Sequence, residues 1–133
     1  MTYMIEKLPD ENIIVVTYTV PFDIQQDTGG AITDTGEMLE GMTPPVLRVS
    51  DFSTARLDFS QIVVGMASSI EKKPGAVGDE RLIDVLVGTV QELGTIVANG
   101  YRQEQYGSLS VQYFTSMDEA LNVGRQLLAE STP

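Results

Sequence analysis

Two tyrosines and an arginine stand close together in the segment from Tyr101 to Gly107, near the end of a predicted helix. Loops at the ends of helices and strands commonly carry the groups that bind ligands or partners. Tyr101, Arg102 and Tyr106 are therefore candidate binding residues. The alternative interpretation is an ordinary helix end, in which Gly107 is the cap and Tyr106 lies on the edge of the core.

A run of acidic residues between positions 23 and 40 offers a second kind of chemistry. Grouped carboxylates can bind a divalent cation or a basic partner, but a calcium site needs oxygens that converge from a shaped loop. No Asp-x-Asp-x-Asp-Gly loop is present, so we predict a solvent-exposed helix face and no metal ligand. The run consists of Asp23, Asp27, Asp34, Glu37 and Glu40.

The chain contains no histidine and no cysteine. This excludes disulfides, thiolate metal sites, thiol nucleophiles and the Ser-His-Asp triad. An enzyme would need carboxylate, tyrosine or lysine chemistry, and Lys72 and Lys73 beside Pro74 look exposed rather than buried enough for a lowered lysine pKa. The glycines at 29–30 and 75–78 match no nucleotide-binding motif. The sequence therefore predicts a protein that is not an enzyme and holds no cofactor.

The composition limits the partners further. The 133 residues carry 19 acidic and 8 basic side chains, a formal net charge of −11, which argues against nucleic acid and anionic membranes. The amino-terminal residues lack the apolar stretch of a signal peptide, and no apolar run is long enough to span a bilayer. We expect one soluble, cytoplasmic domain over residues 1–133.

Hydrophobic periodicity and turn residues predict the elements that position these groups. Strands are predicted at Tyr3–Leu8, Ile13–Val20, Val46–Ser50, Leu82–Val87 and Ser110–Thr115. Helices are predicted from Asp23 to the prolines at 44–45, from Phe59 to Ile70, from a capping box at Thr89, and from a capping box at Ser116. Asp58 is expected to cap the second helix, and Ile62, Val63 and Met66 are expected to face the core. The order β-β-α-β-α-β-α-β-α predicts an α/β fold with a mostly parallel five-stranded sheet and an antiparallel N-terminal edge strand.

Three stretches in this framework resemble a known family. They are Asp51-Phe52-Ser53, then Leu57-Asp58-Phe59-Ser60 leading into a helix, and the last strand and helix from Phe114 to Leu121. The element order and these stretches resemble the STAS-like domains, the fold of anti-sigma-factor antagonists and related small bacterial regulators. In the antagonists the corresponding loop carries a phosphorylatable serine. The resemblance implies a regulatory role for Ser53, Asp58 and Ser60, although the loop lacks the family's glycines.

The leading hypothesis is a non-enzymatic cytoplasmic regulatory or protein-binding module. The alternative is a small-molecule carrier or sensor with an apolar pocket between sheet and helices, and a third hypothesis is a cofactor-independent enzyme that uses Asp, Glu or Tyr. We expect a protein partner, and we expect a weak homodimer through the exposed edge of the sheet.

Overall fold

The computed structural model describes residues 3–21, 23–55, 59–70, 72–103 and 109–131, without the side chains of residues 24, 59, 62, 63, 68, 69, 92 and 93. The described residues form five strands and four helices in the predicted order. The strands are β1 (Tyr3–Lys7), β2 (Ile13–Tyr18), β3 (Val46–Asp51), β4 (Leu82–Val87) and β5 (Gln112–Phe114). The helices are α1 (Ile24–Leu39), α2 (Phe59–Ser69), α3 (Gln91–Arg102) and α4 (Met117–Ser131).

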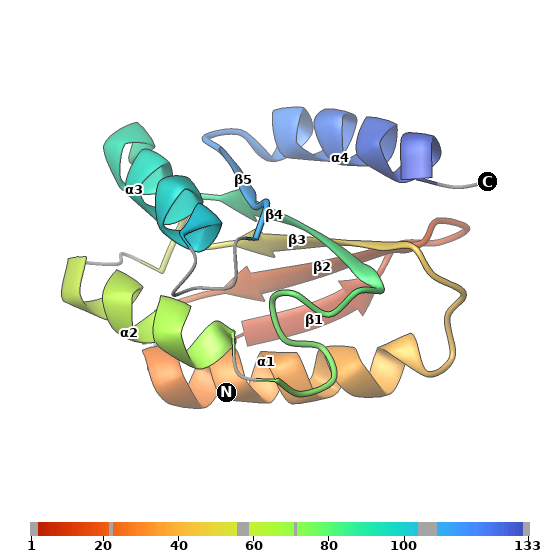
Figure 1. Cartoon of the computed structure of the whole chain (residues 1–133), viewed down its shortest axis with the longest axis horizontal. Helices are drawn as coiled ribbons and strands as arrows, with labels where there is room; N and C mark the ends of the chain where they lie inside the picture. Colours follow the sequence, from red (N-terminus) through yellow and green to blue (C-terminus); the bar gives the residue numbers. More distant parts are fainter. Residues whose placement is uncertain (1–2, 22, 56–58, 71, 104–108, 132–133) are drawn as a thin grey trace.

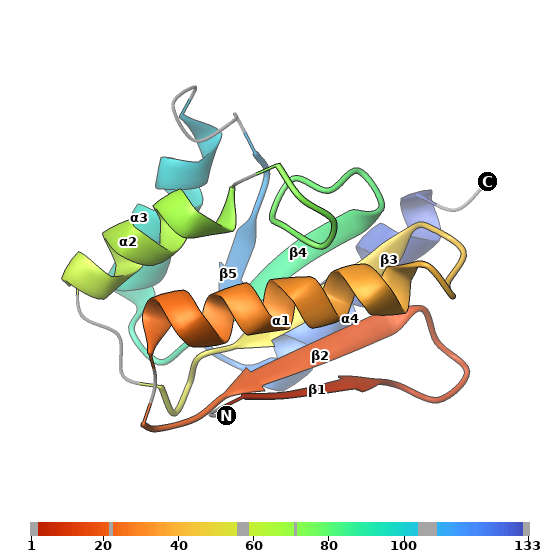
Figure 2. The same cartoon turned by 90° about the horizontal axis from the view of Figure 1, so that it is seen from below.

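The five strands lie side by side in chain order in one mixed sheet (Figure 1). β1 is the antiparallel edge strand, and β2 to β5 run parallel to one another, which confirms the predicted α/β architecture. Helices α1 and α2 lie on one face of the sheet and α4 lies on the other (Figures 1 and 2). Helix α3 contacts β5 and α2. No helix in the described part of the chain is long and apolar enough to cross a membrane.

The face of the sheet that α4 covers is apolar throughout its buried centre. Alternate residues of β2, β3 and β4 point to this face, because successive side chains of a strand point to opposite sides. Gly124 allows α4 to come close, since a Cβ at this position would lie 2.6 Å from a methyl group of Leu47. The buried cluster consists of Ile13, Val15, Leu47, Val49, Val85, Val87 and Ala120.

The opposite face, under α1 and α2, mixes apolar and polar groups. Ile14, Val16 and Val46 are buried there among apolar residues of α1. The Tyr3 hydroxyl donates a hydrogen bond to Asp34 Oδ2 at 2.5 Å. Burial and this neighbouring carboxylate raise the pKa of Tyr3 to about 12. Polar side chains on this face are therefore accepted where they have partners.

Two predicted helix starts are confirmed and one is wrong. The side chain of Asp23 accepts a hydrogen bond from the Gln26 N–H, and that of Ser116 from the Glu119 N–H, so both residues cap their helices. Helix α3, by contrast, begins after Val90, which makes no side-chain cap, and not at a Thr89 capping box. Val90 is extended, with φ of −116° and ψ of 108°, as is usual for the residue that precedes a helix.

The acidic run on α1 is only partly the solvent-exposed face that we predicted. Glu37 and Glu40 are exposed, but Asp27 is buried, with 6% of its surface accessible. The backbone N–H of Asp23 donates to Asp27 Oδ2 at 3.0 Å. Asp27 is buried because it accepts from a backbone donor at the start of the helix, where the helix dipole favours a negative charge.

The last strand is shorter than predicted: β5 covers Gln112–Phe114, not residues 110–115. The Leu109 N–H donates to the Tyr101 carbonyl at 2.6 Å, which holds the chain beside the end of α3. The segment therefore joins the sheet only from Gln112 onward, where it pairs with Val85.

Candidate functional site

The loop after β3 carries the first predicted regulatory residue. Ser53 is half-buried, and its N–H donates to Asp51 Oδ1 at 2.9 Å, which forms a local turn. Thr54 donates its hydroxyl hydrogen to the Tyr18 carbonyl, which ties the loop to the end of β2. Asp58, the expected cap of α2, lies outside the described residues. Ser53 is thus held in a turn at the carboxyl end of the sheet.

Ser60, the second predicted regulatory residue, is exposed in the first turn of α2. Val64 and Ala67 are also exposed and lie four and seven residues further on, so the three share one helix face. Met66 points elsewhere and is buried, with its methyl group close to Gly100 of α3. We call the face formed by Ser60, Val64 and Ala67 the outer face of α2. The side chains of the predicted core residues Ile62 and Val63 are not described.

Of the predicted group at the end of α3, the two residues that the structure describes differ in exposure. Tyr101 is buried beside Val97 and Val111, with 5% of its surface accessible. Arg102 is exposed. Tyr106 lies outside the described residues. The Tyr101 ring therefore belongs to the small core between α2, α3 and the approach to β5.

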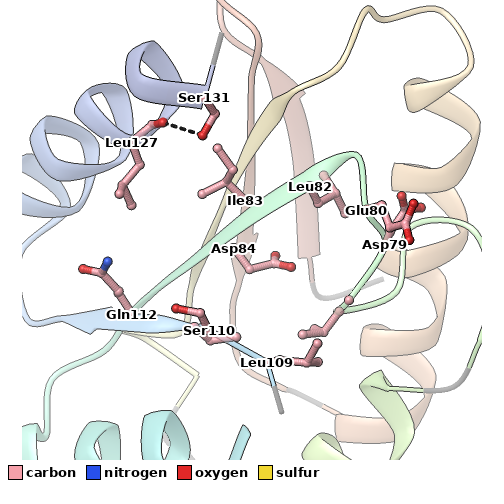
Figure 3. A pocket seen from close by; sticks show the side chains of 13 residues that line it. Asp79, Glu80, Leu82, Ile83, Asp84, Leu109, Ser110, Gln112, Leu127 and Ser131 are labelled. Atoms are coloured by element: carbon pink, nitrogen blue, oxygen red, sulfur yellow. Dashed lines mark hydrogen bonds between the residues drawn. The ribbon is translucent and has the colours of Figure 1, made fainter. Parts of the chain in front are cut away.

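A pocket that the sequence did not suggest lies at the edge of β4 (Figure 3). It has a volume of about 360 Å³. It opens where the chain before β5 bends away from β4, so the shortness of β5 creates it. Its lining comes from the loop before β4, from β4, from the approach to β5 and from α4: Val77, Gly78, Asp79, Glu80, Leu82, Ile83, Asp84, Leu109, Ser110, Val111, Gln112, Leu127 and Ser131.

An ion pair stands behind this pocket in the interior. Arg48 of β3 and Asp84 of β4 are direct neighbours in the sheet, and both side chains are almost fully buried. Arg48 Nε donates to Asp84 Oδ1 at 2.6 Å, and Nη2 donates to Oδ2 at 3.1 Å. Arg48 Nη1 also donates to the Gly75 carbonyl. Burial acts to lower the pKa of Arg48, but the charge of Asp84 and its hydrogen bond outweigh burial and raise the pKa, so Arg48 stays charged.

Asp79 shapes the loop that forms one wall of the pocket. Its carboxylate accepts from the Arg81 side chain at 2.8 and 3.0 Å, from the Arg81 N–H and from the Gly75 N–H. Arg81, followed by the backbone donors, holds the pKa of Asp79 well below its usual range. Gly75 has φ of +85°, a conformation that favours glycine, and its neighbours leave no room for a Cβ.

The described residues contain no group of three or more acidic side chains arranged to hold a metal ion. In the comparisons with known proteins, no family model matches the chain, and no curated protein or solved structure matches it. The fold and the two surfaces described above therefore carry the functional argument on their own.

Proposed function

We propose that this chain is a non-enzymatic, cytoplasmic regulatory or protein-binding module of STAS-like architecture, and that the outer face of α2 receives its partner. The observation that supports the proposal is the exposed pair Ser60 and Val64, one helical turn apart on the same face. Val64 leaves 38% of its surface accessible although α2 packs against both α1 and α3. Val64 can contact an apolar surface of a partner, and modification of the neighbouring Ser60 hydroxyl could turn that contact on or off.

The position of Ser60 suits regulation by phosphate. It lies in the first turn of α2, where the helix dipole and free backbone N–H groups favour a negative charge. A phosphate there would change the charge of the outer face of α2 without disturbing buried groups. The resemblance to anti-sigma-factor antagonists supports this assignment, because their loop carries a phosphorylatable serine at the corresponding place.

The chemistry of the partner follows from charge. With a formal net charge of −11, the protein attracts a basic surface and repels an acidic one. We therefore propose a partner whose docking surface has an apolar centre and a basic rim. Association should slow as salt is added, because screening removes electrostatic steering.

The test is site-specific photo-crosslinking in the native cells. A crosslinking amino acid replaces Val64 in one form of the protein and Asn122, exposed on α4, in the control form. A protein captured at position 64 and not at 122 is then assayed against purified wild type, Val64→Lys and Ser60→Asp. The proposal expects both variants to weaken binding, because each places a charge against the apolar centre of the partner's surface, where the charge loses its water, rather than against the basic rim. Equal binding of all three proteins, or no capture specific to position 64, would overturn it.

A second candidate function, a carrier or sensor of a small apolar ligand, is supported by the pocket beside β4. Its volume of about 360 Å³ falls in the range of ligand pockets, and Leu109 and Leu127 provide apolar contacts. A thermal-shift screen against metabolites and lipids tests it. A saturable rise in Tm with an apolar compound would support the carrier, because a ligand stabilises the state that binds it. No change in Tm with any compound would rule out the carrier function.

A further inference from the structure

Among the described residues, half of β4 has no neighbouring strand on the side that faces the pocket. All six residues of β4 pair with β3 on one side, but on the other side β5 pairs only with Val85, Leu86 and Val87. The pocket occupies the space beside the remaining half, from Leu82 to Asp84, where β5 would continue if the chain did not bend toward Tyr101. It is therefore a notch in the sheet with the place of half a strand left open.

The backbone of β4 is oriented toward this notch. On the β3 side, the Val87 carbonyl accepts from Phe52 N–H, and on the β5 side, the Gly88 N–H donates to the Phe114 carbonyl. Because successive residues of a strand direct their backbone groups to opposite neighbours, the even-numbered residues of β4 face the β5 side. The carbonyl of Leu82 and the N–H of Asp84 are thus directed at the notch.

The side chains on the two sides of the notch differ in kind. Ile83 points to the α4 face, where it packs against the apolar cluster, and Leu127 lies nearby (Figure 3). Asp84 points to the opposite face, which is also the side of its partner Arg48. Glu80 stands at the mouth and is exposed. An extended segment in the notch would therefore meet an apolar surface with one side chain and carboxylates with the next.

We propose that the notch beside Leu82–Asp84 receives a short extended segment of a partner protein by strand addition, and that this segment alternates apolar and basic residues. Main-chain hydrogen bonds to a sheet edge supply affinity in this mode, and alternate side chains supply specificity. Asp84 and Asp79 already have arginine partners, so Glu80 provides the charge that selects basic residues. The notch is separate from the outer face of α2, and either proposal can fail without the other.

The test uses a six-residue peptide of alternating valine and lysine, acetylated and amidated at its ends. Binding to the ¹⁵N-labelled full chain is followed by NMR, and the expected shifts centre on Leu82, Ile83 and Asp84. Two further peptides carry N-methyl groups, one on the valines and one on the lysines. Only one of these two sets of N–H groups can face β4. One methylated peptide should therefore lose about tenfold in affinity, and the other should keep most of its affinity.

Charge variants complete the test. Glu80→Lys should lower the affinity for the peptide up to about fivefold at low salt, the range of an exposed ion pair. Glu37→Lys, the same change at an exposed position of α1, should leave the affinity unchanged. Equal binding of the two methylated peptides would overturn strand addition, and so would full displacement by spermidine, which would show a simple cation site. Shifts at β1 or no binding of any peptide would also overturn it. So would a dimer mass in light scattering together with concentration-dependent NMR shifts at the notch without peptide, because a second copy of this chain would then occupy it.

Discussion

The two faces of β3 and β4 are buried equally well by different means. Toward α4, Leu47, Val49 and Val85 are fully buried in an apolar layer. Toward α1 and α2, the same two strands present Arg48 and Asp84, which are 4% and 8% accessible. The apolar face needs only residues of suitable size and shape, whereas the polar face needs each charge to have a specific partner.

This difference determines what each face can control. The apolar layer holds α4 against the sheet wherever the side chains fit. The guanidinium of Arg48 instead joins three segments at once, because it bonds to Asp84 of the adjacent strand and to the Gly75 carbonyl of the loop before β4. The polar face therefore positions the loop that forms one wall of the pocket, and substitutions on the two faces should separate their contributions to stability.

The largest expected effect comes from removing the buried cation. Arg48→Met keeps a long side chain but leaves Asp84 buried without its partner, and it should lower the free energy of unfolding by about 3–5 kcal/mol. Urea unfolding followed by circular dichroism measures the change. Arg102→Met, the same substitution at an exposed position, is the control and should stay within about 0.5 kcal/mol of wild type.

A double variant sharpens the same point. Arg48→Met combined with Asp84→Leu removes both charges, and it should recover most of the stability that the single variant loses, because no unpaired charge remains in the interior. If the double variant is no more stable than Arg48→Met alone, packing rather than the unpaired carboxylate explains the loss.

On the apolar face, Leu47→Ala should cost about 2–5 kcal/mol in the same unfolding assay. Leu47 is fully buried and lies against Gly124, so truncation leaves a cavity that α4 can fill only in part. Met4→Ala, at an apolar residue that is 66% accessible, serves as the matched control and should change little. A loss below about 1 kcal/mol for Leu47→Ala would mean that α4 settles into the space.

Asp79→Asn tests the loop that depends on the polar face, with an expected loss of about 1–3 kcal/mol at pH 7. The pKa of Asp79 is lowered in the folded protein by its bonds from Arg81 and the backbone. Its stabilisation is therefore complete above the unfolded-state pKa of about 3.9 and declines as the pH falls through the folded value. The difference between wild type and variant should shrink below about pH 4, and a difference that grows toward acid would contradict this assignment.

The smallest effect is expected at the rim of the apolar face. Arg125 Nε of α4 donates to Glu11 Oε1 at 2.9 Å, and both side chains are more than a third accessible. Arg125→Gln should therefore cost about 0.2–1 kcal/mol, and less in high salt. A loss of stability as large as that of Arg48→Met would show that the exposed pair Arg125–Glu11 contributes as much as the buried pair Arg48–Asp84, and that exposure does not explain their difference.

The sequence was sufficient to predict the order of strands and helices, because apolar runs and helix-capping residues can be recognised in it without knowledge of the fold. The bounds of β4 were predicted residue for residue, since every residue of Leu82–Val87 except Asp84 is apolar. Capping by Ser116 was predicted from its side chain and the spacing to Glu119, and the start of the first helix at Asp23 was predicted without its capping bond. Local signals of this kind need no knowledge of which strands are neighbours.

The pocket and the buried ion pair could not be predicted in this way. Arg48 and Asp84 are 36 positions apart, and only the pairing of β3 with β4 brings them together. The pocket depends on the backbone hydrogen bond from Leu109 to Tyr101, and no residue type in the sequence predicts that bond. The one available signal was Asp84 itself, a charged residue inside an apolar strand, and no partner was predicted for it.

The ion pair also acts as a check on how the chain assembles. If β4 slid along β3 by one residue while the sheet formed, every side chain of β4 would turn to the other side. Asp84 would then enter the apolar layer beside Leu47 and Val49 while Val85 left it, and Arg48 would face an apolar neighbour with its charge unpaired. The mispaired sheet would bury two isolated charges, so the ion pair between these strands discriminates against misfolded alternatives that the apolar side chains alone would tolerate.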